Sequence, residues 1–464
     1  MSGPAQDTAD TPVRVAIIGS GPAGSYTAGH LLRHSAPELH VDLFERLPTP
    51  WGLVRAGVAP DHPKIKSVTR IYERTAEHAR LRYFGNVSFG ADVTLEDLRE
   101  HYHAIVYAVG APRDRALRIP GEDLDGSYAA TDFVGWYNGH PDYRDHEFDL
   151  RGERAIVIGA GNVALDVARM LLLAHEELAC TDIADHALEV LSASAIEEVL
   201  VVARRGPEQA AFTNPELLEL GELSVADVVV DAEELALADG VTDPAADATA
   251  RRNVEILRDY AARRPSGKPK RIALRFLLSP VALTGAGHVE AVTFVRNELQ
   301  MQTDGSLRAR ATQQQFTIGA HAVFRAIGYR GTPLPGVPFD ERRALIANDA
   351  GRVVGPEGVR RGEYVVGWAK RGPSGVIGTN KKDSNETVDH LLEDLGAGRL
   401  LTPAPITDAA LEAHVRALQP AMVDYAGWTR IDRHERRLGE PAGRPRVKLT
   451  RIAEMLDAAQ PEDE

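Results

Sequence analysis

The sequence predicts an α/β protein with two dinucleotide-binding (Rossmann-like) domains, one inserted into the other. Two observations predict this fold class. A β-branched strand pattern near the N-terminus runs into a glycine-rich turn and then a helix pattern, and the same order recurs about one third of the way along the chain. The chain has 464 residues, more than one hydrophobic core usually serves, so we expect two domains.

The first glycine-rich turn follows the predicted strand 13–18 and forms a complete GxGxxG motif. Its residues are Gly19, Ser20, Gly21, Pro22, Ala23 and Gly24. In this motif the first glycine permits a tight turn, the second lets the backbone approach a pyrophosphate, and the third lets the helix pack closely on the strand. The N-terminus of the following helix offers its amides to the phosphates.

The strand after this turn, 41–44, ends in Glu45, about 20 residues past the last glycine. A carboxylate at this position accepts hydrogen bonds from ribose hydroxyls and repels a 2′-phosphate. The first site is therefore predicted to bind FAD or NAD rather than NADP. A purely structural glycine-rich turn is the alternative.

The second turn follows the predicted strand 154–158 and leads into a helix pattern that ends near Leu173. Its residues are Gly159, Ala160, Gly161, Asn162, Val163 and Ala164. Alanine in place of the third glycine is a substitution that the motif tolerates. The second turn is therefore predicted to bind a second dinucleotide.

The next strand, 199–203, ends in Arg204 and Arg205 rather than in a carboxylate. Guanidinium groups offer forked, charge-assisted donors to a 2′-phosphate, so we predict that this site binds NADPH. The two arginines lie about twice the usual interval past the turn, and an inserted helix within 181–195 accounts for the excess. Solvated surface charges are the alternative interpretation.

The domain boundaries follow from two strand-to-glycine exits, 107–111 and 323–329. Three parts of the chain are expected. Residues 1–11 form a disordered tail, residues 12–111 and 332–464 form the FAD domain, and residues 112–331 form the NADPH domain.

A second dense motif lies in the returning part of the FAD domain. The strand 363–366 leads into 367–379, which is predicted to open a helix whose N-terminal amides suit the flavin carbonyls. Trp368 would stack on the flavin or the nicotinamide, or it would serve as a packing tryptophan.

Composition excludes several classes of protein. The net charge of −14 argues against non-specific binding to nucleic acid. The one cysteine, Cys180, cannot form an internal disulfide, a CxxC pair or a cysteine-ligated cluster, so redox chemistry must use a bound organic cofactor. This count excludes thioredoxin-reductase-like chemistry and a glutamate-synthase-type small subunit. We expect Cys180 to be buried filler, the chain to lack a membrane span, and the protein to be cytoplasmic.

Two long strings are more specific than the nucleotide motifs. They are PWGLVRAGVAPDHP at 50–63 and GWAKRGPSGVIGTNKKD at 367–383. Further blocks lie at 15–24, 161–169, 204–207, 211–213 and 216–217. Together these blocks span nearly the whole chain, and the sequence resembles the adrenodoxin-reductase-like ferredoxin–NADP reductases, most closely their actinobacterial type. The resemblance implies a monomer that takes a hydride from NADPH onto FAD and passes single electrons to a ferredoxin-type iron–sulfur protein.

The same resemblance implies the site residues. Those that should contact FAD are Ala23, Glu45, Leu53, Val87, Trp368, Gly375, Val376 and Ile377. Those that should contact NADPH are Arg115, Asn162, Val163, Ala164, Leu165, Arg204, Arg205, Glu216 and Gly375. His62 and Glu216 match family residues at the nicotinamide–flavin junction, where they would orient groups. A loop histidine and a helix N-terminal carboxylate are the structural alternatives.

Ferredoxins are usually acidic, so we expect a basic docking face. The candidate residues are Arg251, Arg252, Arg258, Arg263, Arg264, Lys268, Lys270 and Arg271. An ordinary solvated helix and loop is the alternative. Two other functions stay open at this point, a flavin monooxygenase and a non-catalytic module that senses nucleotides.

Overall fold

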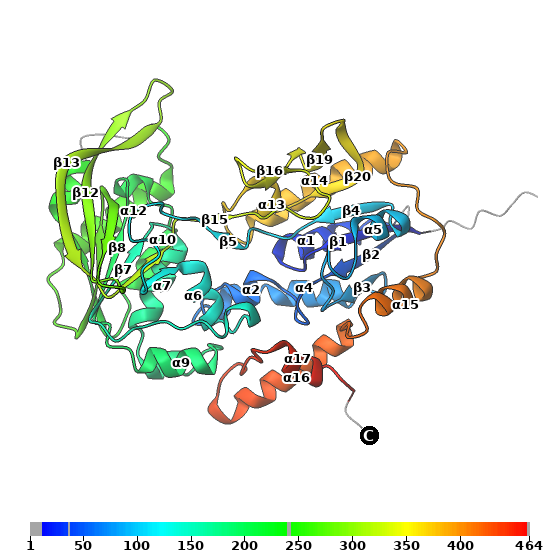
Figure 1. The fold of residues 1–464 in the computed structure, drawn as a ribbon, viewed down its shortest axis with the longest axis horizontal. Coiled ribbons are helices and arrows are strands. Elements are labelled where there is room, and N and C mark those ends of the chain that lie inside the picture. The colour runs from blue at the N-terminus through cyan, green and yellow to red at the C-terminus, as the bar shows by residue number, and fades with distance from the viewer. Residues whose placement is uncertain (1–11, 36–37, 239–242, 462–464) are drawn as a thin grey trace, which may run out of the picture.

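The computed structural model describes residues 12–35, 38–238 and 243–461. The predicted tail, 1–11, lies outside these residues. Figure 1 shows two α/β units side by side. The unit that contains the N-terminal strands is called the first unit and lies on the right, and the second unit, in cyan to green, lies on the left.

The first unit is built on a seven-stranded sheet within the described residues. In spatial order its strands are β18 (Asn348–Asp349), β19 (Arg352–Gly355), β20 (Gly358–Val365), β4 (Ala104–Tyr107), β1 (Val13–Ile18), β2 (Leu39–Phe44) and β3 (Leu81–Phe84). The strands from β20 to β3 are parallel, and β18 and β19 add an antiparallel edge.

Strand β1 is buried on both faces because its apolar side chains alternate between two cores. Val15 and Ile17 pack into one hydrophobic cluster, and Ala16 and Ile18 pack into another. The first cluster is covered by α1 (Pro22–Leu31) and α14 (Thr379–Gly396), and the second by α5 (Leu95–His101) and α15 (Asp408–Leu418). A strand that is apolar throughout is what a parallel sheet with two covered faces requires.

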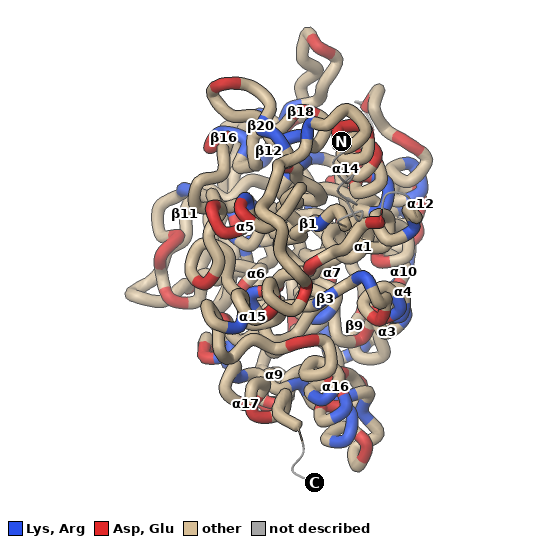
Figure 2. Tube along the Cα trace, turned by 90° about the vertical axis from the view of Figure 1, so that its right-hand side faces the viewer, with Lys and Arg blue, Asp and Glu red and all other residues tan. Residues whose placement is uncertain are grey.

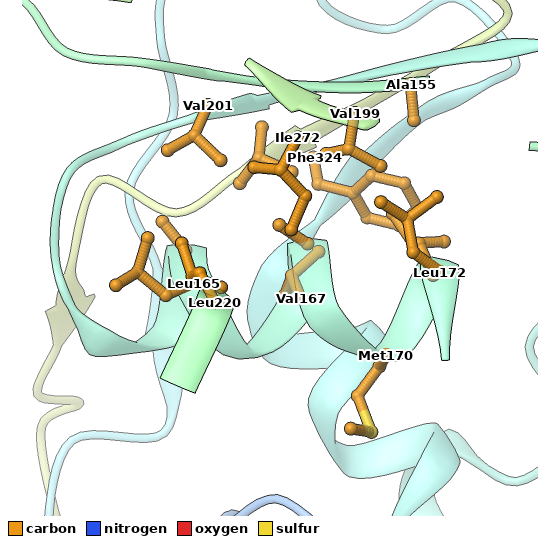
Figure 3. Close-up of a cluster of buried hydrophobic side chains, with 14 of the residues drawn as sticks. Ala155, Leu165, Val167, Met170, Leu172, Val199, Val201, Leu220, Ile272 and Phe324 are labelled. Carbon is orange, nitrogen blue, oxygen red and sulfur yellow. The ribbon is translucent and has the colours of Figure 1, made fainter. Parts of the chain in front are cut away.

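The second unit is built on a six-stranded parallel sheet within the described residues. In spatial order its strands are β6 (Ser127–Ala129), β14 (Ala322–Arg325), β7 (Arg154–Ile158), β8 (Glu198–Val202), β10 (Lys270–Arg275) and β9 (Ala226–Val230). One face is covered by α6 (Ala130–Tyr137), α7 (Asn162–Leu172) and α10 (Asn214–Leu220), and Figure 3 shows α7 side chains such as Leu165 and Val167 packed beneath Val199 and Val201.

An antiparallel sheet covers the other face of this second sheet. Its strands are β11 (Leu278–Thr284), β12 (Ala291–Met301) and β13 (Leu307–Gly319). Val292 and Phe294 of β12 pack against Ile156 and Ile158 of β7. The second sheet is therefore covered by helices on one side and by strands on the other.

The chain crosses between the two units twice, and the crossings run together. The short strands β5 (Arg113–Asp114) and β15 (Tyr329–Arg330) pair antiparallel. The first sheet takes its strands from 13–107 and 348–365, and the second from 127–325. The predicted fold class, with one nucleotide domain inserted into the other, is confirmed. The boundaries 12–111, 112–331 and 332–464 stay a prediction.

The C-terminal segment joins both units. Helices α16 (Tyr425–Gly439) and α17 (Ile452–Ala458) pack Trp428 and Met455 into a core of the first unit. Between these helices, Lys448 Nζ donates to Asn138 Oδ1 at 3.1 Å, and Arg444 Nη1 lies 2.5 Å from Asp185 Oδ1 of the second unit. Figure 1 shows this segment, in orange and red, beneath both units.

The remaining elements are short connections, apart from α12. They are α2 (Leu53–Ala56), α3 (Pro63–Lys66), α4 (Thr69–Ala76), α8 (His175–Leu178), α9 (Asp185–Ser192), α11 (Ala232–Ala238), α12 (Ala248–Ala262), α13 (Trp368–Arg371), β16 (Phe339–Asp340), β17 (Leu345–Ile346) and the 3-10 turns Pro141–Tyr143, Pro207–Gln209 and Glu440–Ala442. Within the described residues, no helix is long and apolar enough to cross a membrane.

Two details of the sequence interpretation can be scored here. The inserted helix predicted within 181–195 is α9, and it accounts for the long interval before Arg204. The expectation that Cys180 is buried is wrong, because the residue is exposed in the turn between α8 and α9. A small apolar side chain in a surface turn has no core to enter.

Candidate nucleotide sites and the junction between them

The two glycine turns are built alike. A Cβ on Gly19 would lie 2.6 Å from the carbonyl oxygen of Ala108, and a Cβ on Gly159 would lie 2.2 Å from that of Ala326. Ala108 and Ala326 each follow the strand next to the turn's own strand, β4 and β14. Both glycines also have positive φ, at 106° and 147°. The first glycine of each motif is therefore required by the neighbouring strand.

Two segments distant in sequence lie against the first turn. A Cβ on Gly52 would lie 2.9 Å from the Cα of Gly21, and a Cβ on Gly367 would lie 2.6 Å from the Cβ of Ala23. Gly21 caps α1 without a side-chain acceptor, so the first-turn amides keep their capacity for an outside anion. A Cβ on Gly24 would lie 2.0 Å from the carbonyl oxygen of Gly19, which explains the third glycine.

Glu45 lies beside this turn, as its position after β2 predicts. Its Oε2 accepts hydrogen bonds from Ser20 Oγ at 2.6 Å and from the Ser20 amide at 3.1 Å. The Val87 amide donates to the Glu45 carbonyl at 2.9 Å, so Val87 is adjacent, although its side chain is buried in the core. Leu53 is 41% exposed at the start of α2, next to Gly52. The turn amides and the Glu45 carboxylate suit a pyrophosphate and a ribose, and contacts of Leu53 and Val87 with FAD stay predictions.

The return segment brings a second set of predicted residues to the first unit. Trp368 is half-buried at the start of α13, and its ring lies 5.1 Å from the ring of Tyr329 on the crossing strand β15. Gly375 has a φ of +79°, Val376 is exposed, and Ile377 packs against the same cluster as Ala23. The sequence predicted that this segment opens one helix. The structure has two helices here, α13 and α14, with the turn 372–378 between them.

The second turn leaves space at its middle glycine. A Cβ on Gly161 would meet no atom within 4 Å, and Gly161 caps α7 without a side-chain acceptor. Asn162 accepts a hydrogen bond from the Thr213 amide at 2.8 Å. The side chains of Ala164 and Leu165 are fully buried, so these two residues can reach a nucleotide only through their backbone. Val163 is partly buried against the same core.

Arg204 and Arg205 follow β8 at the edge of the sheet where β7 ends in the glycine turn. Both side chains are exposed, and within the described ranges neither guanidinium makes a hydrogen bond or an ion pair. Asn297 fixes the backbone here, because its Nδ2 donates to the Arg204 carbonyl at 2.9 Å. Two cations without a protein carboxylate suit an anionic ligand such as a 2′-phosphate. Arg115 lies apart from them, directly after the crossing strand β5, with its Nε 3.4 Å from the Tyr329 carbonyl.

The structure brings His62 and Glu216 together at the junction of the two units. Their Nε2 and Oε2 atoms are 3.8 Å apart, and the side chains are only 8% and 9% exposed. His62 Nε2 also lies 2.8 Å from Glu219 Oε2. Burial, with a smaller contribution from Asp166, raises the pKa of Glu216 to about 7. Glu216 also lies in the first turn of α10. This position is compatible with the structural alternative, a carboxylate that interacts with the dipole at the N-terminus of a helix.

Arg169 holds this cluster together, and the sequence interpretation gave it no site role. Its guanidinium donates to Asp61 at 2.6 and 3.1 Å and to Asp166 at 2.7 Å, and Nη2 lies 2.9 Å from His62 Nε2. Two buried atoms of this cluster, Arg169 Nη1 and Glu216 Oε2, have no hydrogen-bond partner among the described residues, and they are 3.7 Å apart. A buried donor and a buried acceptor left unpaired are costly unless a ligand satisfies them.

Comparison with known proteins agrees with this geometry. The family profile "Pyridine nucleotide-disulphide oxidoreductase" matches residues 13–205, so the fold and the two glycine turns define a pyridine-nucleotide flavoprotein oxidoreductase. The chain is 51% identical to "NADPH-ferredoxin reductase FprA" of Mycobacterium leprae, over 95% of this chain and 97% of that protein. It is 42% identical to the mitochondrial "NADPH:adrenodoxin oxidoreductase" of Salvelinus fontinalis, over 96% and 91%. The chain belongs to the NADPH–ferredoxin reductase family.

A solved structure gives the same result. The chain matches Mycobacterium tuberculosis FprA in complex with NADPH with a TM-score of 0.92 and 50% sequence identity, covering 97% of this chain and 99% of that one. The predicted family, enzyme class and cofactors, FAD and NADPH, are confirmed. The individual contacts predicted for each site residue stay predictions.

Proposed function

We propose that the protein is an NADPH–ferredoxin reductase, with a hydride entering from NADPH and single electrons leaving to a ferredoxin-type iron–sulfur protein. The observation that carries the proposal is the junction cluster, where Asp61 and His62 of the first unit meet Arg169 and Glu216 of the second. FAD, when bound, supplies the chemistry that a side chain lacks, because flavin accepts a hydride and releases electrons singly.

The residues of the two units divide the work of binding. The first glycine turn and Glu45 would hold FAD by its pyrophosphate and ribose, and the second turn would hold the NADPH pyrophosphate. Arg204 and Arg205 would hold the 2′-phosphate, which NADH lacks. Binding energy from these remote contacts then fixes the position of the nicotinamide.

The unpaired atoms of Arg169 and Glu216 match a carboxamide group. A nicotinamide carboxamide has a carbonyl that would accept from Arg169 Nη1–H and an NH₂ that would donate to Glu216 Oε2. Hydride transfer needs no general acid or base, so these groups act by position. His62 would hold the other side of the cluster through Nε2, which either donates to Glu219 or accepts from Arg169.

The docking face for the ferredoxin is proposed on and after α12, around which Figure 2 shows Lys and Arg gathered. Arg251, Arg263 and Arg264 are exposed, which supports the proposal. Several of the predicted residues also have partners within the protein. Arg252 pairs with Glu255 and Arg271 pairs with Glu198. The side chains of Arg251, Lys268 and Lys270 donate to backbone carbonyls. We also propose a monomer, as the family resemblance implies, and a cytoplasmic location, because a chain with one cysteine cannot form an internal disulfide.

The test of the main proposal is reduction of the purified protein in the absence of oxygen. NADPH should bleach the yellow flavin absorbance. When a ferredoxin and cytochrome c are then added, electrons should pass through the ferredoxin and reduce the cytochrome c. A protein that is colourless after gentle purification, or one whose flavin is reduced but whose electrons never reach ferredoxin, would contradict the proposal.

A further inference from the structure

Three side chains on the second unit gather away from the nucleotide sites. Asp149 precedes β7, His288 lies in the turn between β11 and β12, and His321 lies in the turn between β13 and β14. One carboxylate oxygen and one imidazole nitrogen from each histidine lie within 4.8 Å of one another. The three residues line an open hollow of about 630 Å³. The proposed electron transfer uses none of them.

The hydrogen bonding of His288 leaves one ring nitrogen available. Its Nδ1 lies 2.9 Å from the carbonyl oxygen of Val289. A carbonyl can only accept, so Nδ1 carries the hydrogen and Nε2 presents its lone pair. A histidine whose other nitrogen donates to a backbone carbonyl is the usual arrangement of a metal ligand. His288 Nε2 is buried and has no hydrogen-bond partner among the described residues.

His321 faces the same point. Its Nε2 is likewise buried without a hydrogen-bond partner in the described ranges, although it lies 3.1 Å from Asp149 Oδ1. His288 Nε2 lies 3.9 Å from Asp149 Oδ2, and the two imidazole rings are 4.4 Å apart at an angle of 31°. His321 and Asp149 are at ion-pair distance, and the three ligand atoms are close enough together to share one cation.

Two glycines allow the histidine rings this position. A Cβ on Gly126, which has a φ of +85°, would lie 2.6 Å from His288 Cε1. A Cβ on Gly152 would lie 2.1 Å from the Cβ of His321. Both histidines therefore pack directly on the backbone, and their rings are held in place before any ligand arrives.

The geometry points to a divalent transition-metal site formed by Asp149, His288 and His321. Two imidazole nitrogens and one carboxylate oxygen are a donor set that Zn²⁺ accepts, with water in the fourth position. A bound ion would tie the turns at the ends of the antiparallel sheet to the segment that leads into β7. The site would thus stabilise the second unit and take no part in catalysis.

Arg151 sets the affinity of this site. Its Nε and Nη2 donate to the two oxygens of Asp149 at 2.9 and 2.6 Å, so the guanidinium occupies the carboxylate that the ion needs. The Arg151 side chain is 86% exposed, so it can turn into solvent when an ion binds. Removing this competing cation should tighten metal binding.

The experiment measures Zn²⁺ binding to the FAD-loaded full-length protein by equilibrium dialysis and native mass spectrometry. We expect one ion that the wild type binds and that His288→Gln and His321→Gln each bind at least about tenfold more weakly, because even changing a partner of a ligand costs about 10- to 100-fold. Arg151→Met should bind Zn²⁺ more tightly than the wild type. His390→Gln is the matched control, because His390 Nδ1 also lies close to a backbone carbonyl, that of Ala350 at 2.8 Å.

Other results would overturn the inference. The cluster of His62, Glu216 and Glu219 is a second group that could hold an ion. Zinc that survives in the His288→Gln/His321→Gln double variant but is lost in Glu219→Gln, with slowed NADPH oxidation, would place the ion there. If the histidine variants lose their flavin absorbance, Arg151→Met decides alone, and an unchanged affinity for Zn²⁺ in that variant would reject the site.

Discussion

Arg169 Nη1 lies 3.7 Å from Glu216 Oε2 at the junction of the two units, and both atoms are buried without a hydrogen-bond partner among the described residues. Glu216→Ala removes the acceptor from this pair. A hydrogen bond to a charged group contributes about 1.5–3 kcal/mol, so kcat/KM for NADPH should fall by about 10- to 100-fold. Steady-state kinetics with ferricyanide as the electron acceptor measure this loss.

The control for this prediction is Glu219→Ala, which removes the neighbouring carboxylate, 44% exposed, but leaves Glu216 and Arg169 in place. It should reduce kcat/KM by much less. Equal losses in the two variants would show that the pair has no special part in holding the carboxamide.

The choice between NADPH and NADH should depend on Arg204 and Arg205. Replacing both with Gln removes two charge-assisted contacts to the 2′-phosphate, each worth about 1.5–3 kcal/mol. Stopped-flow reduction by NADPH should therefore slow at subsaturating concentrations, while reduction by NADH stays the same. Arg252→Gln is the control, since that side chain pairs with Glu255. A preference for NADPH that survives in the double variant would refute the assignment.

The stability of the protein should carry a pH dependence from Glu216. Burial raises the pKa of this carboxyl from an ordinary 4.5 to about 7, so the folded state binds its proton more tightly than the unfolded state. The penalty for ionising Glu216 is absent below about pH 4.5, grows as the pH rises, and is complete above about pH 7. At one pKa unit per about 1.4 kcal/mol, it reaches roughly 3 kcal/mol.

Glu216→Gln removes this titration. The variant should match the wild type in Tm near pH 4.5 and exceed it near pH 8, which thermal unfolding of the nucleotide-free protein measures. A Tm difference that shrinks as the pH rises would have the wrong sign and would contradict burial as the cause.

The sequence was sufficient for the parts of the site that local spacing defines. Gly19, Glu45 and Gly159 lie where a strand, a turn and the next strand must place them, so their roles follow from position along the chain. Arg169 could not be found this way. It lies three residues after Asp166 on a helix, a spacing that also describes an ordinary surface pair, and only the packing of His62 against α7 and α10 buries it.

The metal site proposed for Asp149, His288 and His321 shows the same limit. Each residue lies in a different connecting segment, and no short motif links them. Only the register of β13 with β12, and of β14 with β7, brings the turns together. The prediction that Cys180 is buried was wrong for a related reason. Whether a residue in a turn is exposed depends on where the neighbouring helices end.

The last prediction concerns the docking face for ferredoxin. Arg251 and Arg252 are exposed at the start of α12, and reversing both to Glu would replace attraction of an acidic partner with repulsion. The apparent KM for ferredoxin should rise, most strongly at low ionic strength, because such attraction acts over about 10 Å at 0.1 M salt. Reduction of ferricyanide by NADPH should stay the same, since that small acceptor needs no docking face.

Arg308→Glu/Arg310→Glu is the matched control, with the same change of net charge on exposed positions of β13. If the two double variants raise the KM for ferredoxin equally, the effect belongs to the total charge of the protein. If only the Arg251 and Arg252 reversal does so, and the difference disappears as salt is added, the ferredoxin docks on the α12 face. A loss of ferricyanide reduction in the Arg251 and Arg252 variant would instead trace the defect to the nucleotide sites, because α12 packs on α10, which carries Glu216.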